Sequence, residues 1–250
     1  MTPPVVALPL ASLPVPLSLP KIPTWGMIRL TGITKEGATH PMTVTHERFE
    51  QGMTYAAYKE QMTRNRARLE ENERTVELVA SDLAFFHALP EALKVVVITE
   101  DWCGDAIANL PVLARLAEAS GKLELRIFLR DQNLDLMDQY LKEGKYRSVP
   151  TIVFFSADLR QLGVWIERPA KITAQQSAEL ETLLSTAPEL QGIDPNTSPA
   201  LLPEAARNRV MRFYTEFQAR TRVDANAEVV REVRALVEAG LARQEASHGA

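Results

Sequence analysis

The sequence has little cysteine and histidine, and it has no excess of positive charge. Cys103 is the single cysteine among 250 residues, which excludes an intrachain disulfide and predicts a reducing compartment, by default the cytoplasm. The net charge of −4 at pH 7 argues against a nucleic-acid partner, because such proteins usually carry a basic surface. No run approaches the ~18 apolar residues that a membrane span requires, so no membrane partner is expected. The four histidines show no metal-ligand spacing, and one cysteine cannot build a zinc site with them, so no metal is predicted.

What is present is an ordinary globular composition, with 46% hydrophobic and 24% charged residues, at a length that allows one domain with extensions or two small domains. Residues 1–23 stand apart as a proline-rich leader. Three prolines break the apolar run 5–19 and the first charge is Lys21, so the pattern of a secretory signal is missing. We expect an extended, disordered leader, with a strand or sleeve packed on the body as the alternative.

Residues 24–90 predict an N-terminal helical extension. Thr43 or Thr45 can cap a short helix that ends at Gly52, and a longer helix is predicted from residue 55 to about residue 73. Three arginines of this segment could suggest an anion site, but residues two apart do not share a helix face. A solvated helix surface is therefore favoured for these arginines, which are Arg64, Arg66 and Arg68.

Residues 91–187 alternate between strand and helix patterns, which predicts an α/β domain with helices on both faces of a sheet. The apolar, β-branched run 95–98 is typical of a strand that is covered on both faces. Further strands are expected at 123–129, 151–155 and 162–166, and helices at 104–119, at 134–141 with Asn133 as cap, and at 173–184 with Thr173 as cap.

Residues 188–250 predict a linker followed by a C-terminal helical segment. Pro203 is expected to begin one helix, and Asp224 is expected to cap a separate last helix. The last helix carries an apolar stripe, for which core packing is favoured over a dimer seam, at Val230, Val233, Val237 and Leu241.

Three groups of residues around the first predicted strand and the 151–155 strand form a recognisable pattern. They are Trp102-Cys103-Gly104, Pro111 eight residues after the cysteine, and Ser148-Val149-Pro150 at the start of the later strand. In this order, on these elements, they resemble the active-site tryptophan, cysteine and glycine, the helix-kinking proline and the cis-proline of the thioredoxin superfamily. The resemblance implies a thioredoxin-like fold with a central mixed sheet, carrying N- and C-terminal helical extensions.

More closely, the chain resembles a group of bacterial thioredoxin-family proteins with a single-cysteine Asp-Trp-Cys-Gly-Asp site, here residues 101–105. The flanking segments that resemble this group are Gly52-Met53-Thr54-Tyr55 with Asn65-Arg66, and 126–131 with 136–141.

Departures from the thioredoxin pattern change the chemistry that it implies. Ala106 occupies the position of the second, resolving cysteine, so a dithiol–disulfide cycle within the chain is excluded. Val97 stands six residues before the nucleophile, where thioredoxin buries a proton-handling aspartate. Asp105 replaces the proline of the thioredoxin site.

The pKa of the Cys103 thiol is expected to be modestly lowered. A thiolate at a helix N-terminus is favoured by the macrodipole and by free backbone N–H groups, whereas Asp101 and Asp105, if near, oppose it by like-charge repulsion. Asp105 itself has two interpretations. It is either a helix N-terminal residue that interacts favourably with the dipole, which is favoured, or a proton shuttle for Cys103.

The resemblance also implies that Val149-Pro150 is a cis peptide that faces Cys103 and leaves the Val149 backbone free to pair with an extended substrate. Trp102 is expected on the surface beside the thiol. The candidate catalytic residues are therefore Cys103 and Asp105, and the candidate substrate-binding residues are Trp102, Gly104, Val149 and Pro150.

Three functions are compatible with this site. The leading hypothesis is a monothiol thiol–disulfide oxidoreductase, in which Cys103 attacks a mixed or protein disulfide and an external thiol, small or on a partner protein, resolves the product. No bound cofactor is expected, and a low-molecular-weight thiol would be a co-substrate. The alternatives are a redox-inactive thioredoxin-fold binding module and a single-cysteine thiol sensor.

Overall fold

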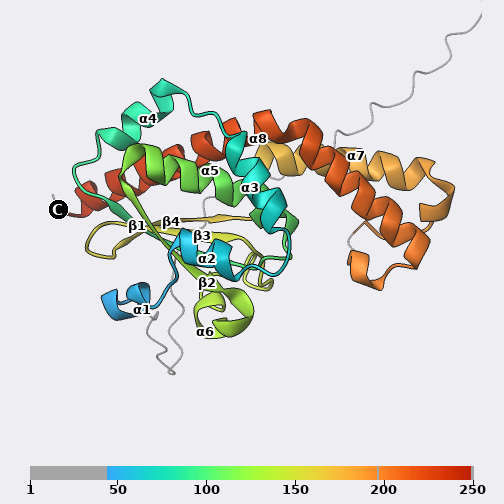
Figure 1. The fold of residues 1–250 in the computed structure, drawn as a ribbon, viewed down its shortest axis with the longest axis horizontal. Coiled ribbons are helices and arrows are strands. Elements are labelled where there is room, and N and C mark those ends of the chain that lie inside the picture. The colour runs from blue at the N-terminus through green and yellow to red at the C-terminus, as the bar shows by residue number, and fades with distance from the viewer. Residues whose placement is uncertain (1–43, 196, 249–250) are drawn as a thin grey trace, which may run out of the picture. The chain divides into compact units, whose positions relative to one another are not determined.

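A four-stranded mixed sheet forms the centre of the computed structural model, which describes residues 44–195 and 197–248 (Figure 1). The predicted leader 1–23 and residues 24–43 of the predicted extension lie outside the described residues. The strand order is β2-β1-β3-β4. The strands are β1 (Leu93–Thr99), β2 (Leu123–Leu129), β3 (Thr151–Phe155) and β4 (Gln161–Ile166). β1 pairs with β2 in parallel, and the pairs β1–β3 and β3–β4 are antiparallel, so the predicted mixed α/β sheet is confirmed.

The central strand β1 is buried on both faces, as its continuous apolar run indicates. Val95 and Val97 join a core under α5 (Gly104–Ser120), α3 (Arg66–Arg74), α4 (Ala80–His87) and the C-terminal half of α8 (Glu204–His248). Val96 and Ile98 join a second core on the opposite face, with side chains of α1 (His46–Glu50) and α6 (Leu134–Met137). Helices therefore cover both faces of the sheet (Figure 1).

Helix α5 carries the candidate site at its N-terminus and is anchored along its length. It keeps Pro111 inside the helix, and the side chains of Ile107, Leu110 and Leu113 are fully or almost fully buried. The helix stops at Gly121, which adopts a left-handed conformation with φ of 63° that glycine reaches without a steric penalty. The packing of α5 therefore fixes the position of the residues that precede the helix.

The C-terminal segment differs from the prediction, because α8 is one continuous helix of 45 residues. Asp224 is an exposed residue inside this helix and caps nothing, so the prediction of a separate last helix is wrong. Val230, Val233 and Val237 are buried against the sheet, which makes the predicted stripe core packing. Burial of this stripe against the sheet stabilises the helix beyond residue 224.

The sheet face beside β4 is covered by α8, whereas α7 (Ala170–Thr186) packs against α8. The close approach of α8 to β4 depends on two glycines. A Cβ at Gly163 would lie 2.5 Å from Leu236 Cδ2, and one at Gly240 would lie 2.6 Å from the backbone oxygen of Leu162. The predicted domain boundaries after residue 90 and after residue 187 stay predictions.

Three predicted helices have different boundaries in the structure. The helix expected over 55–73 is interrupted between α2 (Tyr55–Gln61) and α3, where Asn65 adopts a left-handed conformation with φ of 56°. Helix α6 begins after Asn133 as predicted but ends at Met137 and has four residues; Asn133 is its N-cap residue, although its side chain donates to the backbone oxygen of Leu129 and makes no capping bond. Thr173 lies inside α7 and donates its hydroxyl to the backbone oxygen of Pro169, so it is not the predicted cap.

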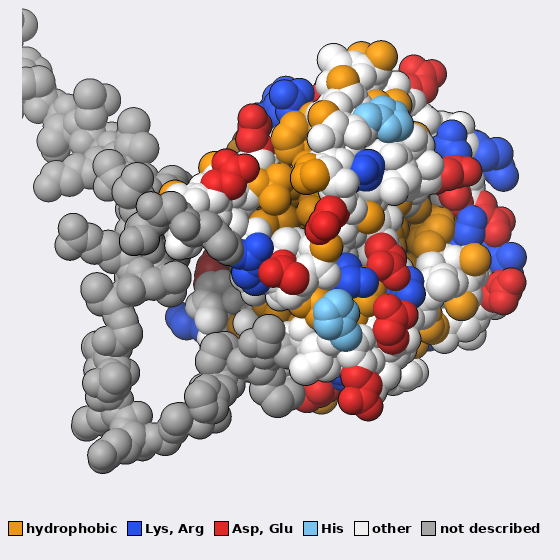
Figure 2. All heavy atoms as spheres, turned by 90° about the vertical axis from the view of Figure 1, so that its left-hand side faces the viewer, with side chains coloured by type: hydrophobic (Ala, Val, Ile, Leu, Met, Phe, Trp, Pro, Cys, Tyr) orange, Lys and Arg blue, Asp and Glu red, His pale blue; other side chains and the backbone are white. Residues whose placement is uncertain are grey.

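Charged side chains of both signs are interspersed on the face of the molecule in Figure 2, with hydrophobic side chains between them. Within residues 44–195 and 197–248, no helix combines the length and the apolar character that crossing a membrane would require.

The contact between α8 and β4 generates a prediction about stability. In an exposed helix Gly→Ala stabilises by about 1 kcal/mol. At Gly240 the new Cβ would collide with backbone, and overpacking typically costs ~1–3 kcal/mol. We expect Gly240→Ala to lower the free energy of unfolding, measured by urea titration. The matched control is Ala239→Gly at the exposed neighbour, which should cost about 1 kcal/mol. A Gly240→Ala protein more stable than the wild type would contradict the proposed contact.

Candidate thiol site

The Cys103 side chain lies where the strand β1 passes into helix α5. Cys103 is the N-cap residue of α5, and its thiol donates a hydrogen bond to the backbone oxygen of Val149 over 3.2 Å. The Val149-Pro150 peptide bond is cis. The two segments meet because β1 and β3 pair antiparallel with Ile98 opposite Thr151. The residues after β1 and the residues before β3 therefore leave the sheet at the same end of the strands.

Burial dominates the electrostatics of the thiol. The Cys103 residue is 8% exposed, and desolvation, followed by the charge of Asp105, raises the pKa of Cys103 to about 11. Backbone hydrogen bonds from Ala106 and Asp105 and the charge of Arg168 act in the opposite direction. A helix dipole contributes typically 0.3–1 kcal/mol, less than the ~1.4 kcal/mol that shifts a pKa by one unit. The predicted lowered pKa is therefore wrong, because the dipole is too weak to offset burial.

The Asp105 carboxylate forms an ion pair with Arg168. The Arg168 Nε donates to Asp105 Oδ1 over 3.0 Å, and its Nη2 donates to Asp105 Oδ2. The Gln218 Nε2 on α8 also approaches Asp105 Oδ1, at 3.4 Å. The carboxylate thus forms a two-pronged salt bridge, a geometry that fixes both side chains. This arrangement favours a positioning role for Asp105 over proton transfer.

Asp101, the other acid of the motif, holds the loop before α3. Its Oδ2 accepts hydrogen bonds from the backbone N–H groups of Thr63, at 2.8 Å, and Arg64, at 3.0 Å. Its backbone oxygen accepts a hydrogen bond from Asn65 Nδ2 at 2.9 Å. These bonds explain why the helix predicted over 55–73 is broken at this point. They also give a structural role to the Asn65-Arg66 segment.

The remaining candidate residues surround the thiol in different ways. Trp102 is 43% exposed, and the Arg130 guanidinium lies 5.0 Å from its ring centroid, a cation–π distance. A Cβ at Gly104 would lie 3.4 Å from Gln218 Nε2. Ala106 is fully buried. The structure thus brings Cys103, Val149 and Pro150 together, with Trp102 at the surface next to them.

Sequence reasoning missed Arg168 and Asn109, which complete the surroundings of the thiol. Asn109 is 3% exposed, and its Nδ2 donates to the backbone oxygens of Asp105 and Glu167, both at 2.9 Å. A hairpin argument could have found Arg168. Because Ile166 pairs with Thr151 at the end of β4, the residues after it return to the cis-proline, and Glu167 N–H donates to the Pro150 oxygen at 2.7 Å.

No group of three or more histidine, cysteine, aspartate or glutamate side chains that could hold a metal ion occurs in the described part of the chain. The groups found at the site are the Cys103 thiol, the backbone groups around it and the ion pair of Asp105 with Arg168.

The sequence profile described as "Thioredoxin" matches residues 52–180, just over half of the chain. The chain belongs to the thioredoxin family. No curated protein matches the sequence. This membership confirms the expected thioredoxin superfamily.

Two solved structures resemble this thioredoxin-family chain in fold. One is a protein of unknown function from Pseudomonas aeruginosa, with 16% identity, a TM-score of 0.53, and coverage of 76% of this chain and 94% of its own. The other is an HIV epitope scaffold, with 15% identity, a TM-score of 0.53, and coverage of 77% of this chain and 96% of its own. At these identities the likeness supports the fold, including its helical C-terminal part.

The surroundings of the thiol predict its reactivity as a function of pH. Alkylation requires the thiolate, and the pKa of Cys103 is raised to about 11, so the alkylation rate should keep rising with pH until near 11. Because the Asp105 charge contributes to this rise, Asp105→Asn should lower the midpoint by about one unit and speed alkylation at pH 8.

The matched control is Asp224→Asn, which removes an exposed carboxylate on α8 and should leave the profile unchanged. Slower alkylation of Asp105→Asn at pH 8 would instead indicate that Asp105 transfers protons.

Proposed function

We propose that this protein is a monothiol thiol–disulfide oxidoreductase, in which Cys103 exchanges with a mixed or protein disulfide and an external thiol resolves the product. The observation that carries the proposal is the hydrogen bond from the Cys103 thiol to the Val149 oxygen, over 3.2 Å, next to the cis peptide Val149-Pro150. This bond ties the one nucleophile of the chain to a backbone group that can pair with an extended substrate.

Substrate binding can activate a thiol that is protonated at rest. A hydrogen bond accepted from the neutral thiol stabilises the protonated form and so opposes ionisation. A backbone N–H of an extended substrate that donates to the Val149 oxygen competes with the Cys103 thiol for this acceptor and weakens the hydrogen bond of the thiol. Its pKa then falls, while the backbone N–H groups of Asp105 and Ala106 remain directed at the sulfur. The site thus couples substrate pairing to formation of the thiolate.

The exchange proceeds in two balanced steps. The Cys103 thiolate attacks one sulfur of the substrate disulfide, a new sulfur–sulfur bond forms, and the other substrate sulfur leaves as a thiolate. An external thiolate then attacks the mixed disulfide and releases Cys103. The chain supplies no second sulfur, because its single cysteine is Cys103 and Ala106 lies at the resolving position. The external thiol, of low molecular weight or on a partner protein, is a co-substrate.

The surface next to the thiol suits a protein or small-molecule disulfide. Trp102 presents an exposed ring beside Cys103, and Arg130 stacks on it. An exposed aromatic residue supplies contact area at a low entropy cost. We further propose that the protein works in a reducing compartment such as the cytoplasm, where external thiols are abundant. We assign it to the group of bacterial thioredoxin-family proteins with a single-cysteine site.

The raised thiol pKa favours a second candidate, a redox-inactive binding module. With a pKa of about 11, on the order of 10⁻⁴ of the thiol is ionised at pH 7, against about 3% for a free cysteine. The higher intrinsic nucleophilicity of a more basic thiolate recovers about tenfold. Exchange at the resting site would therefore be about thirtyfold slower than that of a free thiol, and activity depends on activation by substrate.

A turnover assay separates the two functions. Incubation with a peptide mixed disulfide and excess small thiol should give release of the peptide thiol at a rate well above the uncatalysed exchange. Cys103→Ser should reduce this rate to the background, because the hydroxyl cannot form the mixed disulfide. A wild-type rate equal to that of Cys103→Ser, with binding of the peptide retained in both, would support the binding module and contradict the oxidoreductase.

A second thiol at position 106 should convert the proposed monothiol mechanism into a dithiol mechanism. Ala106→Cys places a thiol three residues after Cys103, one helical turn away, so the variant should form an internal disulfide on oxidation and release the product without a second external thiol. The fully buried position predicts a stability loss of about 1–3 kcal/mol.

The matched control is Ala119→Cys, at an exposed position of the same helix, which is too distant to pair with Cys103. Detection of two free thiols in oxidised Ala106→Cys, by mass after alkylation, would contradict the proposed geometry.

A further inference from the structure

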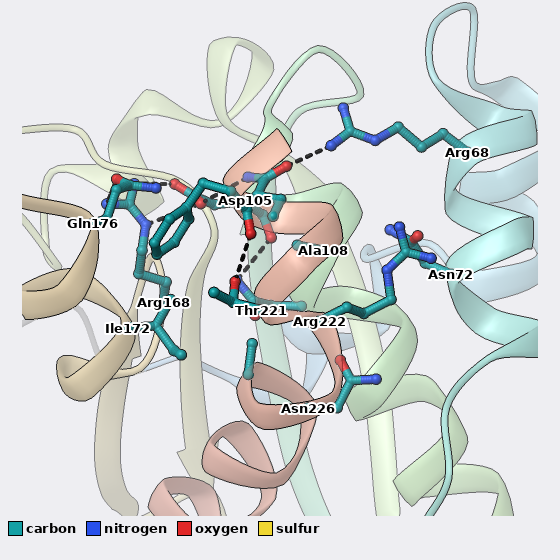
Figure 3. A pocket seen from close by; sticks show the side chains of 14 residues that line it. Arg68, Asn72, Asp105, Ala108, Arg168, Ile172, Gln176, Thr221, Arg222 and Asn226 are labelled. Carbon is teal, nitrogen blue, oxygen red and sulfur yellow. Dashed lines mark hydrogen bonds and ion pairs between the residues drawn. The ribbon is translucent and has the colours of Figure 1, made fainter. Parts of the chain in front are cut away.

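A pocket lies between α3, α5, α7 and α8, beside the N-terminal part of α5 (Figure 3). Its cavity volume is about 30 Å³, which suits a small group, and it is partly open to solvent. Its lining includes Arg68 and Asn72 from α3, Asp105 from α5, and Arg222 and Asn226 from α8. The residues of the proposed disulfide site, Cys103, Val149 and Pro150, are not part of this lining, so the pocket is distinct from that site.

The charges that line this pocket are not balanced. Arg68, Arg168 and Arg222 contribute three cations, and Asp105, the one acidic residue of the lining, is engaged by Arg168. Within the residues that the structure describes, neither Arg68 nor Arg222 has a carboxylate partner. Desolvation, and after it the positive charge of Arg222, lowers the pKa of Arg68. Two guanidinium groups thus face one cavity without a counter-charge.

Two buried amide side chains in the same pocket have unused hydrogen-bonding capacity. Asn226 is 8% exposed, and no described residue hydrogen-bonds to its side chain (Figure 3). Asn72 is 4% exposed; its Nδ2 donates to the backbone oxygen of Ile107 at 2.7 Å, and its Oδ1 has no partner among the described residues. A buried amide without a partner costs ~1–3 kcal/mol. The Asn72 Oδ1 therefore calls for a donor from outside the chain, whereas the polar atoms of Asn226 are within reach of solvent and of a ligand.

We propose that this pocket binds the oxyanion group of a small ligand, a phosphate or a carboxylate. The Arg222 and Arg68 guanidinium groups would supply charge-assisted hydrogen bonds, and the Asn226 amide would donate one more. The bound anion neutralises the excess charge and accepts a hydrogen bond from the Asn226 amide, while the Asn72 Oδ1, itself an acceptor, would take a hydrogen bond from a hydroxyl group of the ligand or of a protonated phosphate. Arg68 keeps its hydrogen bond to Gln218, which positions its guanidinium at the rim.

The position of Arg68 in this pocket differs from the solvated position that the sequence of α3 predicts. Arg66 on the same helix forms an ion pair with Glu70 at its surface, as expected for a solvated face. Arg68 instead turns toward α8, and its hydrogen-bond partner Gln218 lies 150 residues later in the chain. The cationic pair with Arg222 is created by packing of α3 near α8, and spacing within either helix does not predict it.

Thermal unfolding of the full chain at constant ionic strength tests the proposal. Sodium chloride is replaced stepwise by inorganic phosphate in one series and by succinate in another. A ligand that binds the folded state raises the midpoint in a saturable manner, and we expect a rise of several degrees at about a hundredfold excess over the dissociation constant. Saturation with phosphate alone would identify a phosphate group as the ligand, and saturation with succinate alone would identify a carboxylate.

Variants of the pocket locate the binding. Arg222→Gln should weaken the apparent affinity by on the order of ten- to hundredfold, and Asn226→Leu should weaken it as well. Arg212→Gln removes an exposed arginine from the same helix and should leave the affinity unchanged. The absence of a saturable shift with both anions would overturn the proposal. An identical shift in wild type and Arg222→Gln would overturn it too, because binding would then lie elsewhere.

Discussion

The antiparallel pairing of β1 with β3 is the constraint on which the rest of the site depends. It sets Ile98 opposite Thr151, so the chain that follows β1 and the chain that precedes β3 meet, and the thiol of Cys103 lies against the oxygen of Val149. The same pairing buries the sulfur, and this burial raises the pKa of Cys103 to about 11. Proximity to the cis peptide and low resting reactivity therefore have one structural cause.

The helical extensions act on this site as well as on the core. The loop before α3 is bound to Asp101, which accepts hydrogen bonds from the N–H groups of Thr63 and Arg64. α8 covers the sheet at β4 with its second half, and with its first half places Gln218 against Asp105. The additions to the thioredoxin fold thus reach the N-terminus of α5 from two sides. Together with α5 and α7 they line a charged pocket next to this site.

Much of this architecture could be predicted from local patterns. The apolar run of β1 and the alternation of β2 indicated their strands, and Gly121 indicated the end of α5, because each signal depends on neighbouring residues. The continuous helix α8 could not be predicted in this way. Asp224 resembles a cap in isolation, and the reason that the helix continues past it is the burial of Val230 and Val233 against the sheet. Likewise, the break before α3 depends on bonds to Asp101, 36 residues away from Asn65.

By itself the sequence determined the family, the α/β fold, the position of the single thiol and the lack of a second cysteine, because these depend on which residue stands at a motif position. Only the tertiary structure decided the ionisation of Cys103, the partner of Asp105 and the charge of the pocket. The ion pair of Asp105 joins residues 63 positions apart, and the pocket joins α3 to α8. Desolvation and uncompensated charge arise from what packing brings together, and residue spacing along one helix carries no information about them.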